Sequence, residues 1–195
     1  PTGNNNNQIH KWDIPEEYHY NSWIAEKVND LLCDYKNNDD NFFLWASFLD
    51  PHPPYLVPKP WDSMYDPDTI NIPPVLSGEH DCNPPHFALT QQSSPDFSQW
   101  NETNTATHGM HSHIVDRKLF KKDIAVYYGM ISLMDKYIGK ILDKLDELGL
   151  SDNTLIVFTT DHGHFLGQHG LAYKGPFHYE DLVRVPFIVK YSENI

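Results

Sequence analysis

Apolar side chains recur at helical spacing in two stretches of the chain. The first stretch places its apolar positions on one face of an amphipathic helix, at Ile24, Val28, Leu31, Leu32 and Tyr35. The polar run 37–40 ends it with a turn. The second stretch starts at Lys122, carries apolar residues through Leu145, and ends at Gly149. Asp135 interrupts its apolar face, where a buried, hydrogen-bonded carboxylate is expected.

Other stretches have the character of strands. Residues 42–49 form a continuous apolar run, which predicts a strand covered on both faces. Residues 154–160 are rich in β-branched side chains, and another strand is predicted to begin within 185–189. A short helix is predicted at 179–183. Strand, helix, strand, short helix and strand is an α/β order, so the predicted fold class is α/β.

The composition limits the partners of the chain. Its 195 residues carry 14 Lys plus Arg against 27 Asp plus Glu, a formal net charge of −13. This excess of acid argues against nucleic acid as a partner, because phosphate binding depends on surplus Lys and Arg. An anion can still bind through a local cationic site. Since no stretch approaches the roughly 20 apolar residues that a membrane span needs, no span is expected.

Residues 51–121 differ from their surroundings. Eleven of the 15 prolines lie between Pro51 and Pro95, a density that excludes regular helix and central strand. The segment is expected to be a long irregular insertion or lid, and such ordered loops are usually functional. It contains a histidine group from His108 to His113, for which zinc binding, a substrate-facing lid and an ordinary surface loop all stay open.

Residues that can carry chemistry follow the predicted strand 154–160. Ligands of open α/β sheets bind beyond the carboxyl ends of the strands, where Asp161 and His162 stand. Gly163 lets the backbone bend so that both side chains can reach one cation. In the alternative interpretation, Asp161 caps a turn and His162 packs beside it, because short motifs recur by chance.

Further motifs surround this pair in order. Upstream stands Asp50-Pro51-His52-Pro53-Pro54-Tyr55, and downstream stand Gly167-Gln168-His169-Gly170-Leu171, Lys174-Gly175-Pro176 and the run from Phe177 to Phe187. Together these motifs resemble the type I sulfatase family of the alkaline-phosphatase superfamily. The resemblance implies a partial alkaline-phosphatase-like domain with a mainly parallel sheet flanked by helices. Residues 1–195 would be the central-to-late part of one catalytic domain, without its N-terminal part and C-terminal subdomain.

The resemblance also implies roles for individual residues. Asp161 and His162 match two divalent-metal ligands, and Lys174 matches the lysine that contacts the sulfate oxygens. His52 matches the histidine that touches the sulfate or its leaving oxygen, and His169 is expected to lie near the substrate or to support a ligand by a hydrogen bond. Glu180 and Arg184 match positions expected to be structural, as an ion pair.

Calcium is the metal that the family resemblance favours, with Mg²⁺ or Mn²⁺ as alternatives. An aspartate and one histidine suit Ca²⁺ or Mg²⁺ only if further carboxylates complete the ligand set. The family's early Asp-Asp pair is not present. Its nucleophile, a formylglycine made from Cys or Ser in a C/S-x-P/A-S-R motif, is also expected outside this chain, because Cys82 has His86 where that motif has Arg. The chain alone is therefore expected to be inactive.

The expected function is hydrolysis of a sulfate ester, with a sulfated small molecule or carbohydrate as substrate. One alternative is a phosphodiester or phosphonate monoester hydrolase of the same superfamily. Another is a non-catalytic fragment that binds a metal or a glycan. The resemblance suggests an exported, periplasmic or extracellular, or a lysosomal protein, and leaves the oligomeric state open.

Overall fold

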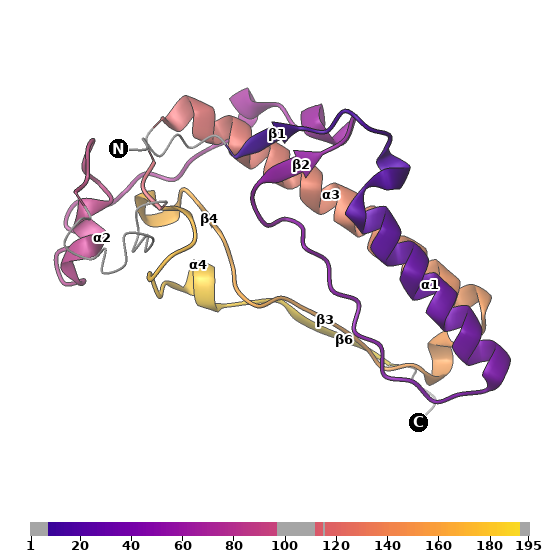
Figure 1. Cartoon of the computed structure of the whole chain (residues 1–195). Helices are drawn as coiled ribbons and strands as arrows, with labels where there is room; N and C mark the ends of the chain where they lie inside the picture. Colours follow the sequence, from indigo (N-terminus) through magenta and orange to yellow (C-terminus); the bar gives the residue numbers. More distant parts are fainter. Residues whose placement is uncertain (1–7, 97–111, 115, 192–195) are drawn as a thin grey trace. The chain divides into compact units, whose positions relative to one another are not determined.

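A computed structural model represents the chain (Figure 1). The chain divides into two compact units. The structure describes residues 8–96, 112–114 and 116–191. The first unit contains residues 67–124 and 159–187. The second unit contains residues 8–66, 125–158 and those from 188 onward.

Helices and strands are interspersed along the described chain. The helices are α1 (Tyr20–Asn38), α2 (Pro85–Leu89), α3 (Arg117–Glu147) and α4 (Glu180–Val183). The strands are β1 (Ile9–Lys11), β2 (Tyr55–Val57), β3 (Ile156–Thr159), β4 (Phe165–Leu166), β5 (Ala172–Tyr173) and β6 (Phe187–Lys190). Single turns of 3-10 helix lie at Glu16–Tyr18, Trp61–Ser63, Pro67–Thr69, Ser151–Asn153 and Gln168–Gly170. The mixture of helix and strand confirms the predicted class.

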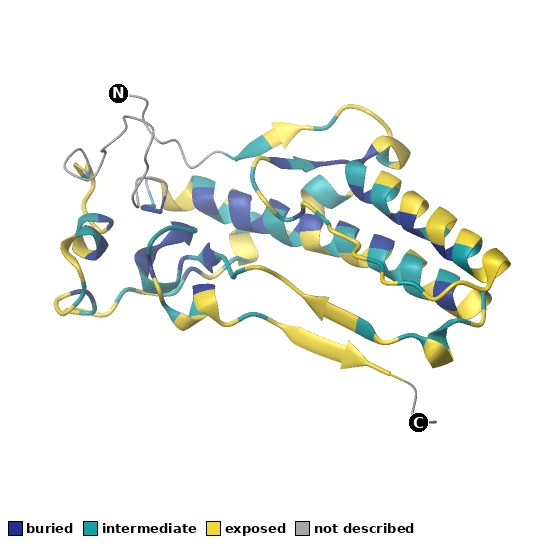
Figure 2. Cartoon of the chain, turned by 60° about the horizontal axis from the view of Figure 1, so that its bottom comes forward, coloured by how far each residue is buried: buried dark blue, intermediate teal, exposed yellow. Residues whose placement is uncertain are grey.

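Helix α1 confirms the first predicted helix. His19 caps its N-terminus, because Nδ1 of the ring accepts a hydrogen bond from the backbone N–H of Asn21 at 3.2 Å. Asp39, in the left-handed conformation at φ 55°, ends it. Val28 and Leu32 on its buried face pack with Leu145 of α3, and Figures 1 and 2 show the two helices side by side.

Helix α3 confirms the second predicted helix, but it begins at Arg117 rather than Lys122. Asp116 caps it, since Oδ1 accepts hydrogen bonds from the backbone N–H groups of the first turn at 2.8 and 3.1 Å. Gly149, at φ 63°, follows its end as expected. Asp135 is exposed, so the expectation of a buried carboxylate there is wrong. The buried side of this turn is formed by its neighbours Leu133 and Tyr137.

The strand predicted at 42–49 does not form in the described chain, where this segment is extended and unpaired. Phe42 and Leu44 pack against the cluster of α1 and α3, whereas Phe43 and Trp45 point outward and are exposed. A strand exists only beside a hydrogen-bonded neighbour. The alternation therefore shows one covered face where the continuous apolar run predicted two.

The other two predicted strands form and pair with each other as β3 and β6. Thr159, the last residue of β3, donates its hydroxyl hydrogen to the carbonyl oxygen of Pro186 at 3.0 Å, so the end of β3 lies beside the start of β6. Figure 2 accordingly shows the two arrows running in opposite directions. The expected parallel pairing is seen between β1 and β2, where Ile9 stands opposite Tyr55.

The first unit is built around an antiparallel hairpin of β4 and β5, which lies between the Asp161–His162 pair and Lys174. Its core is a cluster of aromatic and aliphatic side chains, Phe87, Phe165, Leu171, Phe177 and Leu182. Phe87 comes from α2 and Leu182 from α4, the short helix that the pattern predicted. The proline-rich segment thus contributes directly to the core that supports the hairpin.

The region expected to be irregular, 51–121, is less so than predicted, because it contains β2, α2 and the start of α3. Pro85 stands at the first position of α2, where its missing N–H costs no helical hydrogen bond.

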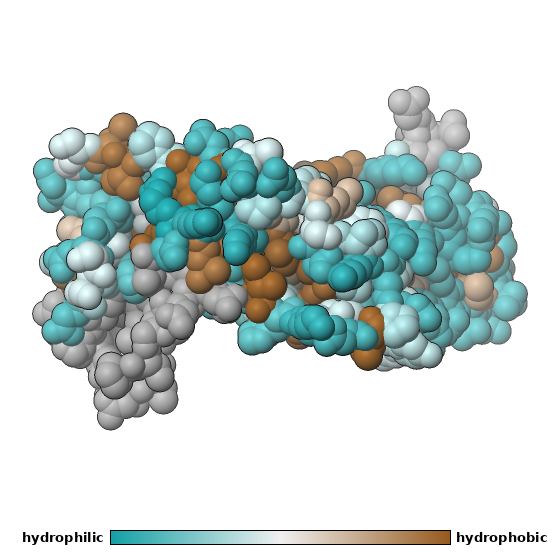
Figure 3. Space-filling model, turned by 90° about the horizontal axis from the view of Figure 1, so that it is seen from above, coloured by the Kyte–Doolittle hydropathy of each residue, from teal (hydrophilic) through white to brown (hydrophobic). Residues whose placement is uncertain are grey.

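Within the described ranges, no helix combines the length and apolar character that crossing a membrane requires. Figure 3 shows that hydrophobic side chains nevertheless reach the surface among hydrophilic ones.

Candidate active site

Asp161 stands in the turn directly after β3 and presents its carboxylate to solvent. The side chain is 81% exposed. Oδ1 accepts hydrogen bonds from the backbone N–H of His162 at 2.9 Å and from the hydroxyl of Thr160 at 3.1 Å. Burial acts to raise the pKa of Asp161, but the bond from the His162 N–H and the nearby imidazole more than offset it, so the pKa lies below its ordinary value. The carboxylate is therefore ionised, and its other oxygen, Oδ2, faces the ring of His162.

His162 is oriented by its own loop. Its Nδ1 lies 2.7 Å from the carbonyl oxygen of Gly163, to which an N–H at Nδ1 donates. This leaves the lone pair on Nε2, the nitrogen that then serves as an acceptor or a metal ligand. Nε2 lies 3.5 Å from Oδ2 of Asp161 and 3.2 Å from Nζ of Lys174. The structure thus brings Asp161, His162 and Lys174 together.

Gly163 allows α4 to approach the loop closely. Its N–H donates to the carbonyl oxygen of Leu182 at 2.7 Å, and a Cβ at this position would stand 2.0 Å from the carbonyl oxygen of Asp181. Any side chain would push the helix away from the loop. Glycine therefore serves close packing here, beyond the backbone bend expected from the sequence.

Lys174 follows β5 and is held by contacts on both sides. Ser112 donates its hydroxyl hydrogen to the carbonyl oxygen of Lys174 at 2.6 Å. Tyr173, at φ 62°, donates its phenol hydrogen to Oδ2 of Asp123 at 2.6 Å, within the first turns of α3. The backbone that carries the ammonium group is therefore fixed by two segments far away in the sequence.

His169 lies at the tip of the hairpin with both ring nitrogens engaged. Nδ1 bonds to a carboxylate oxygen of Glu79, and Nε2 lies 3.0 Å from Oδ2 of Asp181. The ring stacks on Tyr179 with centroids 3.7 Å apart and planes 7° from parallel. This arrangement favours the supporting role over direct substrate contact. Glu79 and Asp181 carried no signal in the sequence, because a single carboxylate in a proline-rich loop or short helix has no pattern that names its partner.

The donors present fit a divalent cation in kind but not in number. Asp161 offers an oxygen and His162 a nitrogen, the pair that the sequence predicted. Among the described residues, no group of three or more histidine, cysteine, aspartate or glutamate side chains could hold a metal ion. The two residues are thus a partial ligand set.

His52 belongs to the second unit, where it is exposed and its Nδ1 contacts the carbonyl oxygen of Pro53. Its loop is anchored by Asp50, which is 5% exposed. One carboxylate oxygen of Asp50 accepts from the hydroxyl of Tyr20, and the other accepts from the amide of Asn21 at 2.6 Å. Burial raises the pKa of Asp50 above its ordinary value, although the hydrogen bond from Tyr20 opposes this.

The histidine group 108–113 lies only partly within the described residues. His108 and His111 are outside them, while His113 is buried and forms an isolated bridge with Leu171 beside β5. In the part of the chain that the structure describes, no ion pair joins Glu180 to Arg184; the backbone N–H of Arg184 bonds to the carbonyl oxygen of Glu180 instead. Cys33 and Cys82 are both free thiols.

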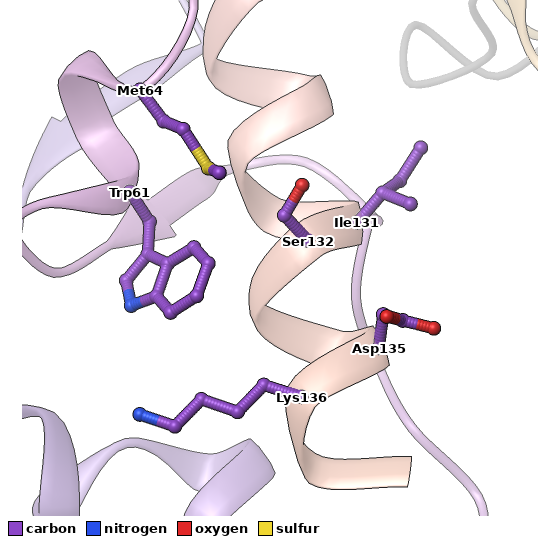
Figure 4. Close-up of a pocket in the computed structure, with 6 residues that line it drawn as sticks. All are labelled: Trp61, Met64, Ile131, Ser132, Asp135 and Lys136. Carbon is purple, nitrogen blue, oxygen red and sulfur yellow. The ribbon is translucent and has the colours of Figure 1, made fainter. Parts of the chain in front are cut away.

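A separate pocket lies on the second unit, outside the motifs. It is lined by Trp61, Met64, Ile131, Ser132, Asp135 and Lys136, as Figure 4 shows. The indole of Trp61 is tied down, because its N–H donates to Glu16 at 2.8 Å, and Lys136 pairs with the same carboxylate at 2.6 Å. The pocket is open and contains none of the residues predicted for the site.

Comparison with known proteins identifies the family of the chain. The family model named Sulfatase matches residues 2–195. An arylsulfatase of Clostridium perfringens is 31% identical over 180 residues, which cover 91% of this chain and 33% of that protein. Human iduronate 2-sulfatase is 28% identical over 158 residues, covering 81% of this chain and 28% of the relative.

A solved structure shows the same fold. The phosphonate monoester hydrolase of Agrobacterium radiobacter superposes with a TM-score of 0.65 at 25% identity, over 92% of this chain and 34% of the other. The chain spans about a third of the length of the relatives that it matches. Because the family model covers almost every residue, the chain belongs to the sulfatase family.

Proposed function

We propose that the protein hydrolyses sulfate esters and that this chain supplies part of the catalytic site. The observation that carries the proposal is the convergence of Asp161, His162 and Lys174 at the carboxyl end of β3, in a chain of the sulfatase family. A sulfate ester develops negative charge on its oxygens in the transition state. An ammonium group and a cation are the groups that stabilise such charge.

Each residue has a proposed role. Lys174 binds the sulfate oxygens through Nζ, and its fixed backbone keeps the ammonium group in place. Asp161 and His162 supply part of the ligand set of a divalent cation, with Ca²⁺ favoured by the family resemblance and Mg²⁺ or Mn²⁺ as alternatives. His52 donates to the leaving oxygen. The bound cation would supply positive charge beside the sulfate, and the formylglycine nucleophile would come from sequence outside this chain.

The proposed substrate is a sulfated carbohydrate. Iduronate 2-sulfatase, by its name, acts on a sulfated sugar acid. The similarity to it covers 81% of this chain. Neither the proline-rich segment nor the described part of the histidine group specifies which sugar.

Replacing Lys174 with Ala tests the proposal. In the full-length enzyme, we expect Lys174→Ala to lower kcat for an aryl sulfate by about 10²–10³-fold, the range found when one oxyanion donor is removed. Lys118→Ala is the matched control, because Lys118 is exposed on α3 in the same unit. Thermal unfolding of both variants should remain close to that of the parent protein. Near-normal turnover by Lys174→Ala would exclude the assigned role.

A second candidate is hydrolysis of a phosphodiester or phosphonate monoester. The similarity to a phosphonate monoester hydrolase supports it. The same Asp161, His162 and Lys174 would serve, because phosphoryl and sulfuryl groups both present negatively charged tetrahedral oxygens. Parallel assays with an aryl sulfate and an aryl phosphodiester separate the two activities. Turnover of neither substrate, with retained binding of Ca²⁺ or of a sulfated glycan, would favour the non-catalytic alternative.

A further inference from the structure

His169 is the centre of a set of contacts that we call the His169 clasp, made of His169, Glu79, Asp181 and Tyr179. Its two ring nitrogens face two carboxylates, Nδ1 toward Glu79 and Nε2 toward Asp181, and a carboxylate only accepts hydrogen bonds. Hydrogen bonds to an ionised acceptor are about twice as strong as neutral ones.

Three separate segments meet in the clasp. Glu79 belongs to the proline-rich segment, His169 to the hairpin tip and Asp181 to α4. The backbone of His169 adds to the connection, because its carbonyl oxygen lies 3.0 Å from Nε2 of His80 and accepts from the amide of Gln91 at 3.2 Å. Glu79 and His169 are 90 positions apart, so the bond fixes the segment against the hairpin over a long loop.

The hairpin transmits this anchoring to Lys174. His169 lies at its closed end, between β4 and β5, whereas Lys174 directly follows β5. The tip is tight, since the backbone N–H of Gly167 donates to the carbonyl oxygen of Leu171 at 3.0 Å. A change in the position of His169 therefore displaces the strand whose next residue is Lys174.

The clasp also reaches the Asp161–His162 loop through α4. The side chain of Asp181 contacts His169, while its carbonyl oxygen lies 2.0 Å from where a Cβ of Gly163 would stand. Gly163 directly follows His162. The same residue of α4 thus contacts the hairpin tip with its side chain and the candidate metal loop with its backbone.

From these contacts we propose that His169 is a positioning residue, which Glu79 and Asp181 lock in place so that Lys174 and His162 stand together. The role in turnover rests on the proposed sulfate ester hydrolysis, but the mechanical role does not. The proline-rich segment is then part of the site's support through Glu79, in addition to any contact with substrate.

Hydrogen exchange tests the mechanical role without any assay of activity. The variants are Glu79→Gln, which removes one charge, and His169→Asn, which removes both bonds but tolerates the left-handed conformation at φ 57°. Asp81→Asn is the control, because Asp81 is an exposed carboxylate two positions from Glu79. We expect both clasp variants to speed the exchange of the Gly167 and Ala172 amides by about tenfold or more, with the control unchanged. Unchanged exchange in both clasp variants would overturn the proposal.

Kinetics on the full-length enzyme test the positioning of Lys174. A structural role alone would reduce the fraction of active enzyme and so lower kcat at constant KM. Loss of positioning should raise KM for an aryl sulfate, and Glu79→Gln should have no further effect on kcat/KM when Lys174 is already Ala. Independent, multiplicative losses would overturn the coupling. If exchange rises but the parent protein hydrolyses no sulfate ester, the clasp stands and the proposed function fails.

Discussion

The hairpin region of the first unit and the strand layer, by which we mean residues 42–49, β3 and β6 and which lies mostly in the second unit, both carry apolar side chains, but these side chains are packed very differently. In the hairpin region, Phe165, Leu171 and Phe177 are fully buried against one another and against α2 and α4. In the strand layer, every residue of β6 and most of β3 are exposed, as is Phe43. Figure 2 shows the contrast as dark blue against yellow.

The contrast shows that apolar composition and burial are separate properties. The hairpin region closes on itself because segments from 87 to 182 converge on one cluster. The strand layer packs only one face, through Phe42, Leu44 and Ile156 on α1 and α3. Stability within this chain should therefore depend strongly on the hairpin cluster and weakly on the outward face of the strands.

Truncating a core phenylalanine should produce the greatest loss of stability. Phe165 is 0% exposed, and we expect Phe165→Ala to lower the free energy of unfolding by about 3–5 kcal/mol, because it leaves a cavity in the cluster. Phe43→Ala is the matched control, since Phe43 is 87% exposed and should change stability by at most about 0.5 kcal/mol. Chemical denaturation measures both. Equal losses would show that the two regions are packed alike.

A substitution of Asp50 tests whether its buried hydrogen bonds stabilise the second unit. Asp50→Ala removes the acceptor for Tyr20 and Asn21, and we expect a loss of about 1–3 kcal/mol, because buried donors are left without partners. Asp152→Ala, at an exposed aspartate of the same unit, is the control. If both variants unfold at the same denaturant concentration, Asp50 does not anchor its loop.

Replacing a buried valine should lower the free energy of unfolding more than replacing an exposed one, but by less than the loss of a core phenylalanine. Val28 on α1 is 6% exposed and Val157 on β3 is 48% exposed. Val28→Thr should cost about 1–3 kcal/mol, because it buries a hydroxyl group, whereas Val157→Thr should stay within about 0.5 kcal/mol. The same denaturation experiment compares them. A larger loss at Val157 would mean that the outward face of β3 is covered in solution.

Lowering the pH should change the contributions of Glu79 and Asp50 to folding stability in opposite directions. Burial acts to raise the pKa of Glu79, but the hydrogen bond from His169 more than offsets it and the pKa falls below 4.5. Its stabilisation is complete above the unfolded value and is lost as pH falls through the folded one. Burial raises the pKa of Asp50 above 3.8, so its ionisation opposes folding, and acid relieves that cost.

Carboxyl-carbon NMR measures this difference directly. The Glu79 side chain should titrate below 4.5 and the Asp50 side chain above 3.8. In His169→Asn, the Glu79 midpoint should return toward its ordinary value, while that of Asp50 should not move. Shifts of the same sign in the parent protein would contradict the assigned environments.

Much of the site was predictable because its parts are near each other in sequence. Asp161 and His162 are adjacent, and the hairpin that returns the chain to Lys174 is short, so nearness in sequence brings Nε2 of His162 and Nζ of Lys174 within reach of each other, while distant contacts hold them there. The helices at 20–38 and 117–147 could also be predicted from the sequence, since apolar periodicity indicates which face of a helix is buried. The strand at 42–49 was predicted wrongly. Hydrophobicity indicates that a segment tends to be buried, but it does not indicate that a neighbouring strand is present to form hydrogen bonds with it.

Local order along the chain was therefore enough for the α/β class, the main helices and the candidate residues after β3. The tertiary structure alone decided that Glu79 and Asp181 hold His169, that Asp50 meets Tyr20, and that Gly163 makes room for α4. These contacts join residues up to 90 positions apart, and a single hydrogen bond between distant segments leaves no periodic trace in either of them. Which partner a side chain finds is set by how the segments pack, and so it becomes visible only in the fold.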